Sequence, residues 1–417
     1  MDNPVAVPIL QHMTAHSDIL IVGGGLNGPA LALALGNAGF TVRIVDSLPK
    51  DVREDAEFDG RAYALALGSQ RLLAGIGLWD AVQSDAQPML EIKVTDGRAG
   101  EGPSPWFMHF DHAEIDEGPM GYLVEDRHLR RAFLAAMEDH PNIEHLAPAT
   151  VVGQSVEAGR VSVSLSDGSE LAARVLIGSD GRTSGTAARA GIKRTQWDYG
   201  QTALVCAVAH KKPHGGIAHQ FFMPGGPLAI LPLTGDRSAI VWSEERARAE
   251  HVAALDDDGF LDALRPAFGD FLGEIALCGK RFTYPLGLSI ANSLVADRVA
   301  LIGDAAHGIH PIAGQGLNAG LRDVAALVDV LIDARKRGED FGGAQTLARY
   351  QSWRQFDTTK LAMATDGFNR LFSNDNPLLR AVRDLGMGAI NASPSLRRAF
   401  IREAAGLNGD LPSLMAR

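Results

Sequence analysis

Hydrophobic residues near the start of the chain follow first a strand pattern and then a helix pattern. Residues 19–22 form a short apolar run with the length of a buried strand, and a glycine-rich turn follows it. Residues 29–37 have the spacing of a helix, and residues 41–45 have the pattern of a second strand. A strand, a helix and a strand in this order predict a βαβ unit with parallel strands and a right-handed crossover.

Two later segments predict antiparallel hairpins. Residues 161–165 alternate apolar residues with serine, turn at an Asp-Gly pair, and continue as an apolar run at 175–177. Residues 228–231 and 239–242 are strand-like runs on either side of a Thr-Gly-Asp turn. The second pair indicates a separate, β-rich region.

The C-terminal half contains the best-marked helix. Residues 299–302 predict a strand, and a loop leads from it into a helix whose apolar residues are spaced on one face over residues 321–332. A Lys-Arg-Gly sequence at 336–338 is typical of a helix C-terminus. Residues 379–417 also read as helical.

Composition and charge narrow the class of protein. Glycine makes up 46 of the 417 residues, and the formal net charge is −11. This acidic balance argues against a nucleic-acid binder, which needs a basic surface. Cys206 and Cys278 are the only cysteines, too few for a disulfide framework. We therefore expect a folded protein of the reducing cytoplasm whose partners are small molecules or proteins.

One uncharged stretch, residues 19–42, is long enough to span a bilayer. It contains six glycines, however, and divides into the strand and helix described above. No lysine or arginine precedes Arg43, so the basic segment that opens a signal peptide is missing. We expect neither a transmembrane segment nor a signal peptide.

A dinucleotide-binding motif occupies the first predicted turn. Gly23, Gly25 and Gly28 form a G-x-G-x-x-G pattern directly after a strand and at the start of a helix. The first glycine permits a tight turn, the second lets backbone amides approach a pyrophosphate, and the third allows close helix packing. Asp46 ends the next strand, where a carboxylate can accept hydrogen bonds from ribose hydroxyls. The motif by itself leaves both NAD and FAD open.

A second candidate site follows the strand predicted at 299–302. Asp304 comes directly after that strand, and a glycine-rich loop at 310–320 opens the next helix. A carboxylate delivered by a buried strand, with helix-start amides beside it, suits the ribitol chain and ring edge of a flavin. A plain connection between a strand and a helix remains the alternative. His307 and His310 lack further ligands at zinc spacing, so we expect no metal site.

The sequence resembles the FAD-dependent aromatic hydroxylases of the para-hydroxybenzoate hydroxylase type, and within them the ubiquinone-biosynthesis hydroxylases. Asp304, in a Gly-Asp pair, is similar to the family's second FAD motif, and Asp180, in an Asp-Gly pair, to its Asp-Gly motif. Residues 310–320 with Asp323 are similar to the signature of the ubiquinone subgroup, and Arg61 matches an arginine that lies along the cofactor. The resemblance covers nearly the whole chain.

The resemblance implies FAD as the cofactor and assigns a role to particular residues. Arg61 would contact the cofactor's phosphates or sugar, and Asp304 its ribitol. Pro311 and His310 would lie near the flavin, where the fixed φ of proline suits a rigid wall. No other catalytic residue is assigned. The implied cofactor-binding residues are Gly23, Gly25, Gly28, Asp46, Arg61, Asp180, Asp304, Gly316, Leu317 and Asn318, of which the last three would hold the ring edge.

One position departs from the family pattern. Many members carry asparagine where Asp126 follows Glu125 here. A second acid beside the first argues against a cofactor contact from the helix that begins there.

The implied fold is α/β, with a discontinuous Rossmann-like FAD-binding domain, an inserted β-sheet substrate domain and C-terminal helices. The expected ranges are 18–85, 120–190 and 285–345 for the FAD-binding domain, 86–119 and 191–284 for the substrate domain, and 346–417 for the helical region.

The implied function is that of an FAD-dependent monooxygenase that hydroxylates a polyprenylated aromatic ring in ubiquinone biosynthesis, through a flavin hydroperoxide. NAD(P)H or a protein electron donor would reduce the flavin, and dioxygen would be the second substrate. A cytoplasmic enzyme would reach such a lipid-tailed phenol at the inner-membrane surface or in a ubiquinone-biosynthesis protein complex. Three alternatives stay open: a flavin hydroxylase of a small soluble aromatic compound, a non-hydroxylating flavoprotein such as a prenyl reductase, and a flavin-binding accessory protein without turnover.

Overall fold

The βαβ unit expected near the N-terminus lies inside an eight-stranded sheet. A computed structural model describes residues 15–98, 102–309, 315–372, 388 and 390–416. In it β1 spans Ala15–Val22, α1 spans Asn27–Asn37 and β2 spans Val42–Val45. β1 and β2 pair in parallel, so the predicted unit is confirmed. Residues 19–21 of β1 are fully buried, as is usual for the central strand of a parallel sheet covered on both faces.

The rest of this first sheet comes from distant parts of the chain. Its order is β17-β18-β11-β1-β2-β8. β10 and β11 pair antiparallel, which confirms the first expected hairpin, while β11 also pairs in parallel with β1. β9 continues the antiparallel part beyond β10. The bounds are β8 Ile143–Leu146, β9 Val151–Glu157, β10 Arg160–Leu165, β11 Glu170–Gly178, β17 Val295–Ala296 and β18 Val299–Leu301.

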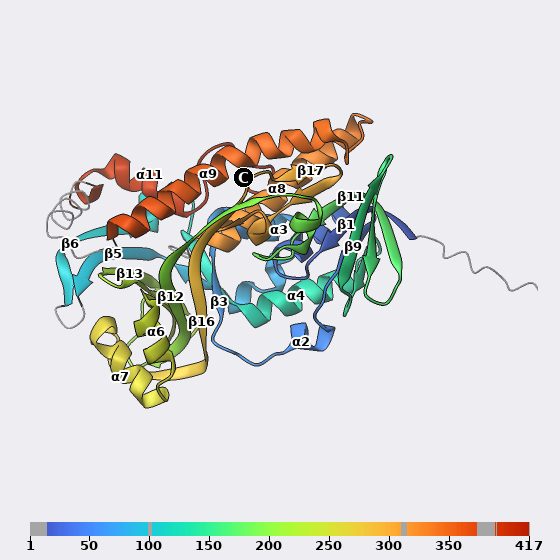
Figure 1. Ribbon diagram of the computed structural model, residues 1–417. Coiled ribbons are helices and arrows are strands. Elements are labelled where there is room, and N and C mark those ends of the chain that lie inside the picture. The colour runs from blue at the N-terminus through green and yellow to red at the C-terminus, as the bar shows by residue number, and fades with distance from the viewer. Residues whose placement is uncertain (1–14, 99–101, 310–314, 373–387, 389, 417) are drawn as a thin grey trace, which may run out of the picture.

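A second eight-stranded sheet has the order β19-β16-β12-β15-β14-β13-β5-β6. β14 and β15 pair antiparallel, which confirms the second expected hairpin. β12 and β16, each 17 residues long, extend from this sheet toward the first one through the middle of the molecule (Figure 1). The bounds are β5 Glu91–Arg98, β6 Gly102–Asp111, β12 Arg194–His210, β13 Ile217–Met223, β14 Gly226–Leu233, β15 Arg237–Glu245, β16 Ile275–Ala291 and β19 His307–Gly308.

A small third sheet packs against the inner face of the second. It has the order β3-β7-β4, with β3 at Ala62–Ala66, β7 at Gly121–Glu125 and β4 at Gln87–Met89. Leu123 of this sheet clusters with Ala207 and Ala239 of the second sheet. Trp242, on the opposite face, packs with Phe260 under α6 (Arg246–Ala253) and α7 (Asp257–Phe268). The second sheet therefore has an outer face covered by helices and an inner face turned toward the first sheet.

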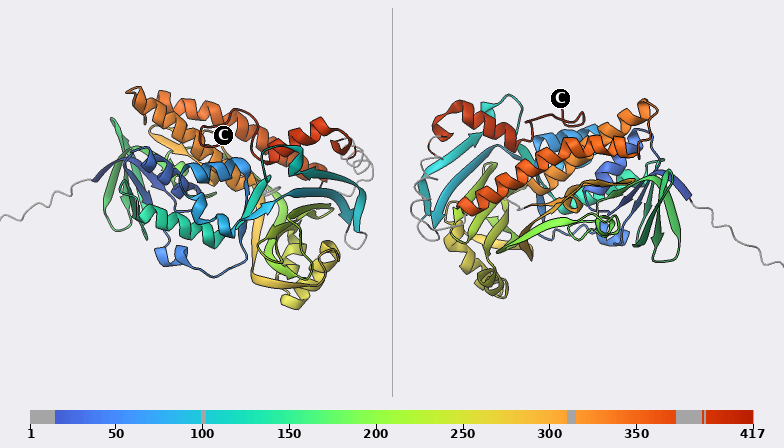
Figure 2. Two further views of the ribbon diagram at one scale, coloured as in Figure 1. Left: turned by 180° about the vertical axis from the view of Figure 1, so that it is seen from behind. Right: turned by 45° about the horizontal axis from the view of Figure 1, so that its top comes forward.

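Two long helices run side by side along one side of the molecule (Figures 1 and 2). α8 spans Gln315–Lys336 and confirms the predicted amphipathic helix, and α9 spans Ala344–Phe372. After α11 (Pro394–Ala404) the chain returns to pack Met415 into the main core beside α8. The other helices are α2 Lys50–Glu54, α3 Leu67–Gly75, α4 Asp126–Glu138 and α5 Gly185–Arg189, with short 3-10 turns at η1 Trp79–Ala81, η2 Gln83–Asp85, η3 His112–Glu114 and η4 Gly303–Ala305.

The fold is α/β, as the sequence predicts. The uncharged stretch at 19–42 forms β1, α1 and β2. Among the described residues, no helix has the combination of length and apolar character that a bilayer span requires.

Candidate functional site

The glycine-rich loop after β1 is packed against the end of β11. Gly23 has φ +116°, and a Cβ there would lie 2.2 Å from the carbonyl oxygen of Ser179. A Cβ on Gly28 would lie 2.0 Å from the carbonyl oxygen of Gly23. Side chains are excluded at both positions, so glycine is required for the loop to fold this way. The loop thus lies next to the strand end that carries Asp180.

The same loop also contacts the second glycine-bearing segment. The Nδ2 atom of Asn27 lies 2.3 Å from the Cβ positions that Gly303 and Gly320 would have. Asn27 therefore lies between η4 and α8. It fits there because Gly303 and Gly320 have no side chains. Its Oδ1 atom is buried and makes no hydrogen bond to the described residues.

Two glycines border open space instead. No described atom lies within 4 Å of the Cβ that Gly25 or Gly316 would carry. Gly25 precedes α1 and Gly316 lies in the first turn of α8, where unpaired backbone amides favour a negatively charged or electron-rich group. With the orphaned oxygen of Asn27, these openings fit a dinucleotide that carries a flavin.

Asp46 is almost fully buried, and its carboxylate already has partners. Arg53 Nε donates to Oδ2 at 2.8 Å and Arg53 Nη2 donates to Oδ1 at 3.1 Å. The amide of Leu48 also donates to Oδ1, at 3.1 Å. The residue expected to bind ribose is thus held by an arginine that the sequence analysis did not single out.

Arg61 is held by two acids. Its Nη2 atom lies 2.7 Å from Oδ2 of Asp59 and 3.1 Å from Oδ2 of Asp126. Burial acts to lower the pKa of Arg61, but the two carboxylates outweigh it and the pKa is raised. The acid at 126, which departs from the family pattern, therefore orients Arg61 from the first turn of α4.

Asp180 binds the first turn of the short helix α5, whose N-cap residue is Ser184. One carboxylate oxygen accepts from Ser184 Oγ, and the other accepts from the amide and the hydroxyl of Thr186, both at 2.9 Å. These bonds fix the loop that packs against Gly23. The structure gives Asp180 a local role and does not by itself place it on a cofactor.

Asp304 presents its carboxylate to solvent. The side chain is 48% exposed, and Arg182 Nε lies 3.6 Å from Oδ2. The carbonyl oxygens of Asp304 and Ala305 accept hydrogen bonds from Arg194. Burial lowers the pKa of the Arg194 guanidinium. Arg194 holds the main chain of η4 while the Asp304 side chain stays available to a ligand.

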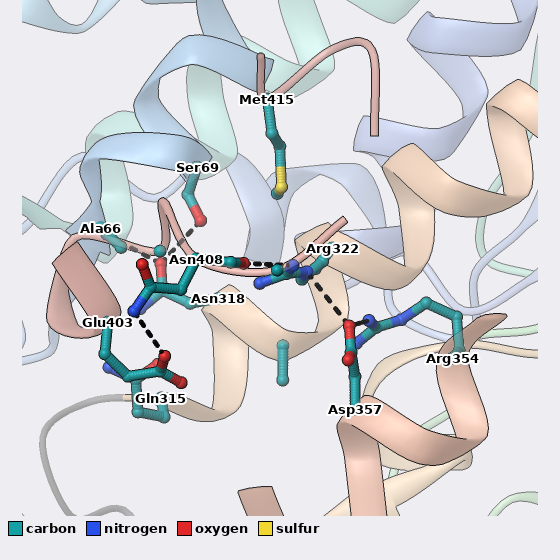
Figure 3. A pocket seen from close by; sticks show the side chains of 13 residues that line it. Ala66, Ser69, Gln315, Asn318, Arg322, Arg354, Asp357, Glu403, Asn408 and Met415 are labelled. Atoms are coloured by element: carbon teal, nitrogen blue, oxygen red, sulfur yellow. Dashed lines mark hydrogen bonds and ion pairs between the residues drawn. The ribbon is translucent and has the colours of Figure 1, made fainter. Parts of the chain in front are cut away.

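Asn318 fastens the start of α8 to β3 and α3. Its Oδ1 accepts from the amide of Ala66 at 2.8 Å and from Ser69 Oγ at 2.7 Å (Figure 3). Its Nδ2 donates to the carbonyl of Ala64 at 2.8 Å. The side chain is thus structural, and contact with a flavin edge from Gly316, Leu317 and Asn318 would come from the main chain. His310 and Pro311 lie outside the described residues.

A small polar cavity of about 130 Å³ lies beside Asn318 (Figure 3). The C-terminal segment closes it, because the carbonyl of Asn408 accepts a hydrogen bond from Arg322 at 2.7 Å. The lining residues are Ala66, Ser69, Gln315, Asn318, Ala319, Arg322, Arg354, Asp357, Glu403, Gly406, Asn408, Gly409 and Met415. Two arginines and two carboxylates balance there, which gives the cavity no net charge to attract an ion.

A buried ionic cluster supports η4, and the sequence alone does not predict it. Asp323 of α8 accepts from Gly303 N at 3.0 Å, lies 2.6 Å from His307 Nε2, and accepts from Arg354 Nε at 2.8 Å. Burial acts to raise the pKa of Asp323, but His307 and Arg354 lower it overall. The sequence marked Asp323 only through the subgroup signature, and nothing there paired it with an arginine on the next helix.

An aromatic surface on the inner face of the second sheet was also not foreseen. Phe282 and Tyr284 of β16 are stacked with centroids 6.4 Å apart, and the Arg61 guanidinium lies 5.4 Å from the centre of the Phe282 ring. Tyr284 pairs with Ala203 in the register of β12 and β16, so both lie on the face that packs toward β3. Burial raises the pKa of Tyr63, and Asp126 raises it further, so this neighbouring phenol stays protonated.

Comparisons with known proteins identify the family. The model of the FAD binding domain family matches residues 16–364. The ubiquinone hydroxylase UbiL of Rhodospirillum rubrum is 43% identical, over 99% of this chain and 96% of that protein. The 3-demethoxyubiquinol 3-hydroxylase of Escherichia coli is 34% identical, over 94% of this chain and 99% of that protein.

A solved structure shares the fold. The p-nitrophenol 4-monooxygenase PnpA of Pseudomonas putida superposes with a TM-score of 0.79, at 20% identity, over 95% of this chain and 99% of that one. At this identity the likeness concerns the fold alone. The sequence matches, however, extend over almost the whole length of the chain and its relatives. The chain therefore belongs to the FAD binding domain family, as an FAD-dependent monooxygenase related to the ubiquinone hydroxylases.

Proposed function

We propose that this enzyme hydroxylates a polyprenylated aromatic ring in ubiquinone biosynthesis, with dioxygen as the source of the new hydroxyl oxygen. The observation that carries the proposal is 43% identity, over 99% of the chain, to a protein named as a ubiquinone hydroxylase. The domain division expected from the sequence belongs to the same proposal. Residues 86–119 and 191–284 would face the substrate, and 18–85, 120–190 and 285–345 would bind FAD.

We infer the FAD-binding residues from where open space and free groups occur. FAD, when bound, supplies redox and oxygen-activating chemistry that no side chain can supply. The amides near Gly25 would receive the pyrophosphate and Asp46 the ribose, while the exposed carboxylate of Asp304 would hold the ribitol. The main chain at Gly316 would hold the ring edge, and Arg61 would contact the phosphates or sugar. Asp180 would act by holding the adjacent loop.

The substrate side of the site would be the aromatic surface on the inner face of the second sheet. Phe282, Tyr284 and Ala203 lie on the face that looks toward β3. An aromatic and apolar surface suits an electron-rich ring with a prenyl chain, and it excludes water from the place where oxygen is transferred. The protein's share of the catalysis is then to orient the ring and to keep the site dry.

The reductant and the route of the substrate are further parts of the proposal. NAD(P)H or a protein electron donor would reduce the enzyme from outside. A lipid-tailed phenol would be taken at the surface of the inner membrane or from a ubiquinone-biosynthesis complex. α11 offers a small apolar surface for such a contact, because Leu396 and Phe400, one helical turn apart, are exposed there.

Isotope labelling tests the reaction directly. Purified holoenzyme is mixed with a polyprenylphenol, NADPH and ¹⁸O-labelled dioxygen, and the mass of the product is measured by mass spectrometry. We expect one heavy oxygen atom in the ring product. Labelling of a small phenolic acid but of no prenylphenol would identify a hydroxylase of soluble aromatics. Labelling of neither, also when the flavin is reduced chemically before dioxygen is added, would identify a protein without turnover.

A variant at Asp304 tests the cofactor assignment separately. Asp304→Ala should purify with less FAD than the native protein, measured as flavin absorbance per protein. Asp333→Ala, which changes an exposed carboxylate on α8 that pairs with Arg337, is the matched control. Full flavin content and full activity in Asp304→Ala would remove the ribitol assignment.

A further inference from the structure

The carboxylate of Asp46 lies against the dinucleotide-binding loop and is hydrogen-bonded by Arg53. A Cβ on Gly24 would lie 2.1 Å from Oδ2 of Asp46, so the acid touches the G-x-G-x-x-G loop itself. Arg53 binds both carboxylate oxygens, through Nε at 2.8 Å and Nη2 at 3.1 Å. The Asp46 side chain is 3% exposed and that of Arg53 is 19% exposed. The guanidinium thus forms the solvent side of the pair, at the mouth of the loop.

The position of Arg53 is set from a different helix. α2 is only five residues long and buries no side chain, so it has little packing of its own. Arg130 of α4 donates through Nη1 to the carbonyls of Val52 at 3.0 Å and Arg53 at 2.7 Å. Arg130 is held in turn by Asp126, from Nε to Oδ2 at 2.7 Å. Two elements far apart in the sequence are therefore joined so that Arg53 stays on Asp46.

Electrostatics explains why such an arrangement would serve a dinucleotide. Asp46 is a nearly buried anion next to a loop whose ligand carries a pyrophosphate, so two negative groups would be brought together. Coulomb repulsion between like charges is stronger in a partly desolvated site than in water. Three of the acceptor positions of the carboxylate are already filled, by Arg53 twice and by Leu48. A ligand at the loop would therefore meet the guanidinium of Arg53 before the carboxylate of Asp46.

We propose that Arg53 is a dinucleotide-binding residue, which recognises the adenosine and phosphate end of FAD while it neutralises Asp46. The proposal rests on FAD as the cofactor and adds a residue that neither the motif nor the resemblance marks. The fork geometry of a guanidinium lets two nitrogens stay on Asp46 while the third remains for a phosphate or ribose oxygen. Arg130 and Asp126 are the positioning residues of this contact.

Retention of FAD by the holoenzyme tests the proposal without any turnover. The holoenzyme is diluted, and the return of free flavin fluorescence gives the fraction of FAD released. Arg53→Ala should weaken FAD binding by about tenfold or more, as expected for a lost charge-assisted hydrogen bond. Arg53→Lys keeps the charge without the fork and should fall between Arg53→Ala and the native protein. Lys50→Ala, on the same helix, is the matched control, because Lys50 Nζ lies 3.3 Å from Oε1 of the exposed Glu138; this variant should retain FAD like the native protein.

A double variant separates recognition from simple charge compensation. In an Asp46→Asn background the buried anion is gone, so Arg53 is no longer needed to neutralise it. A persistent loss of FAD when Arg53→Ala is added to Asp46→Asn supports direct recognition. Disappearance of the Arg53→Ala effect in that background would overturn the proposal, and so would equal FAD retention by Arg53→Ala and Lys50→Ala. Neither result depends on which aromatic compound is hydroxylated, so the proposed reaction stands or falls separately.

Discussion

His307 Nε2 lies 2.6 Å from Oδ2 of Asp323, and both side chains are almost completely buried. The same oxygen accepts the amide of Gly303 at 3.0 Å, and the other oxygen accepts Arg354 Nε at 2.8 Å. One carboxylate on α8 thus fixes the turn that carries Asp304, the short strand that follows it, and α9. The ribitol contact that we propose for Asp304 therefore depends on this buried cluster.

Replacing Asp323 should therefore destabilise the fold and release the cofactor together. Asp323→Ala leaves Arg354, only 3% exposed, paired with the more exposed Asp357 alone, and the loss of one partner from a buried ion pair costs about 3 kcal/mol of unfolding free energy. Urea unfolding with a parallel flavin measurement checks both effects. Asp333→Ala on the exposed side of the same helix should change stability by less than about 1 kcal/mol. Equal midpoints for the two variants would contradict the role given to Asp323.

Asn27 makes a second prediction possible, because its side chain fills space beside Gly320. A Cβ at Gly320 would lie 2.3 Å from Asn27 Nδ2, so Gly320→Ala should overpack this contact and cost about 1–3 kcal/mol. In an Asn27→Ala background the space is free, and the same change should become neutral or stabilising by up to about 1 kcal/mol through helix propensity. Thermal unfolding of the four proteins gives the coupling.

The control for this cycle is another helical glycine. Gly367 on α9 has no described atom within 4 Å of its Cβ position. Gly367→Ala should stabilise the protein slightly in either background, since only propensity changes. A cost for Gly320→Ala that is the same with and without Asn27 would show that the two residues do not interact.

The sequence predicts the parts of the molecule that local chemistry determines. The βαβ unit, both hairpins and the amphipathic helix α8 follow from hydrophobic periodicity and turn residues within short segments. The motif predicts a tight turn at Gly23 and close packing at Gly28, and a Cβ at these positions would clash with the carbonyl oxygens of Ser179 and Gly23. Each of these features depends on neighbours that are close in sequence or on a backbone conformation that only glycine adopts.

The partners of the charged site residues could not be predicted in the same way. Asp46 could be placed at the end of β2, but its pairing with Arg53 depends on how a short helix folds back. Arg61 pairs with Asp126, which is far along the chain. Tertiary packing decides which charged residues form such pairs. Charged residues are common in the sequence, and their spacing along the chain does not show which of them will be partners.

His219 gives a prediction for the pH dependence of stability. Burial, with a contribution from Lys93, lowers its pKa from 6.5 to about 4, and its ring packs on Phe271 at 4.5 Å and near Phe221. Between these two pKa values the unfolded chain binds more protons, so stability rises with pH from about 4 to about 6.5 and falls again on acidification.

Comparison with a variant isolates this effect from other titrating groups. At pH 5 the native protein should lose about 2 kcal/mol of unfolding free energy through His219 relative to pH 7. His219→Phe keeps an aromatic ring and removes the titration, so its loss between the two pH values should be smaller by that amount in urea unfolding. His251→Gln on the exposed side of α6 should keep the native pH dependence. A native slope in His219→Phe would contradict the buried, neutral histidine.

The two cysteines should differ sharply in reactivity. Cys206 is fully buried, and burial raises its pKa to about 12, whereas Cys278 is partly exposed. Because the thiolate is the reacting species, an aromatic disulfide reagent at pH 8 should titrate one thiol in the native protein and both in urea. Cys278→Ser should abolish the native reaction, and Cys206→Ser should leave it intact. Rapid loss of both thiols in the native protein would mean that the core between β12 and α7 opens readily, which the dense packing around Trp242 argues against.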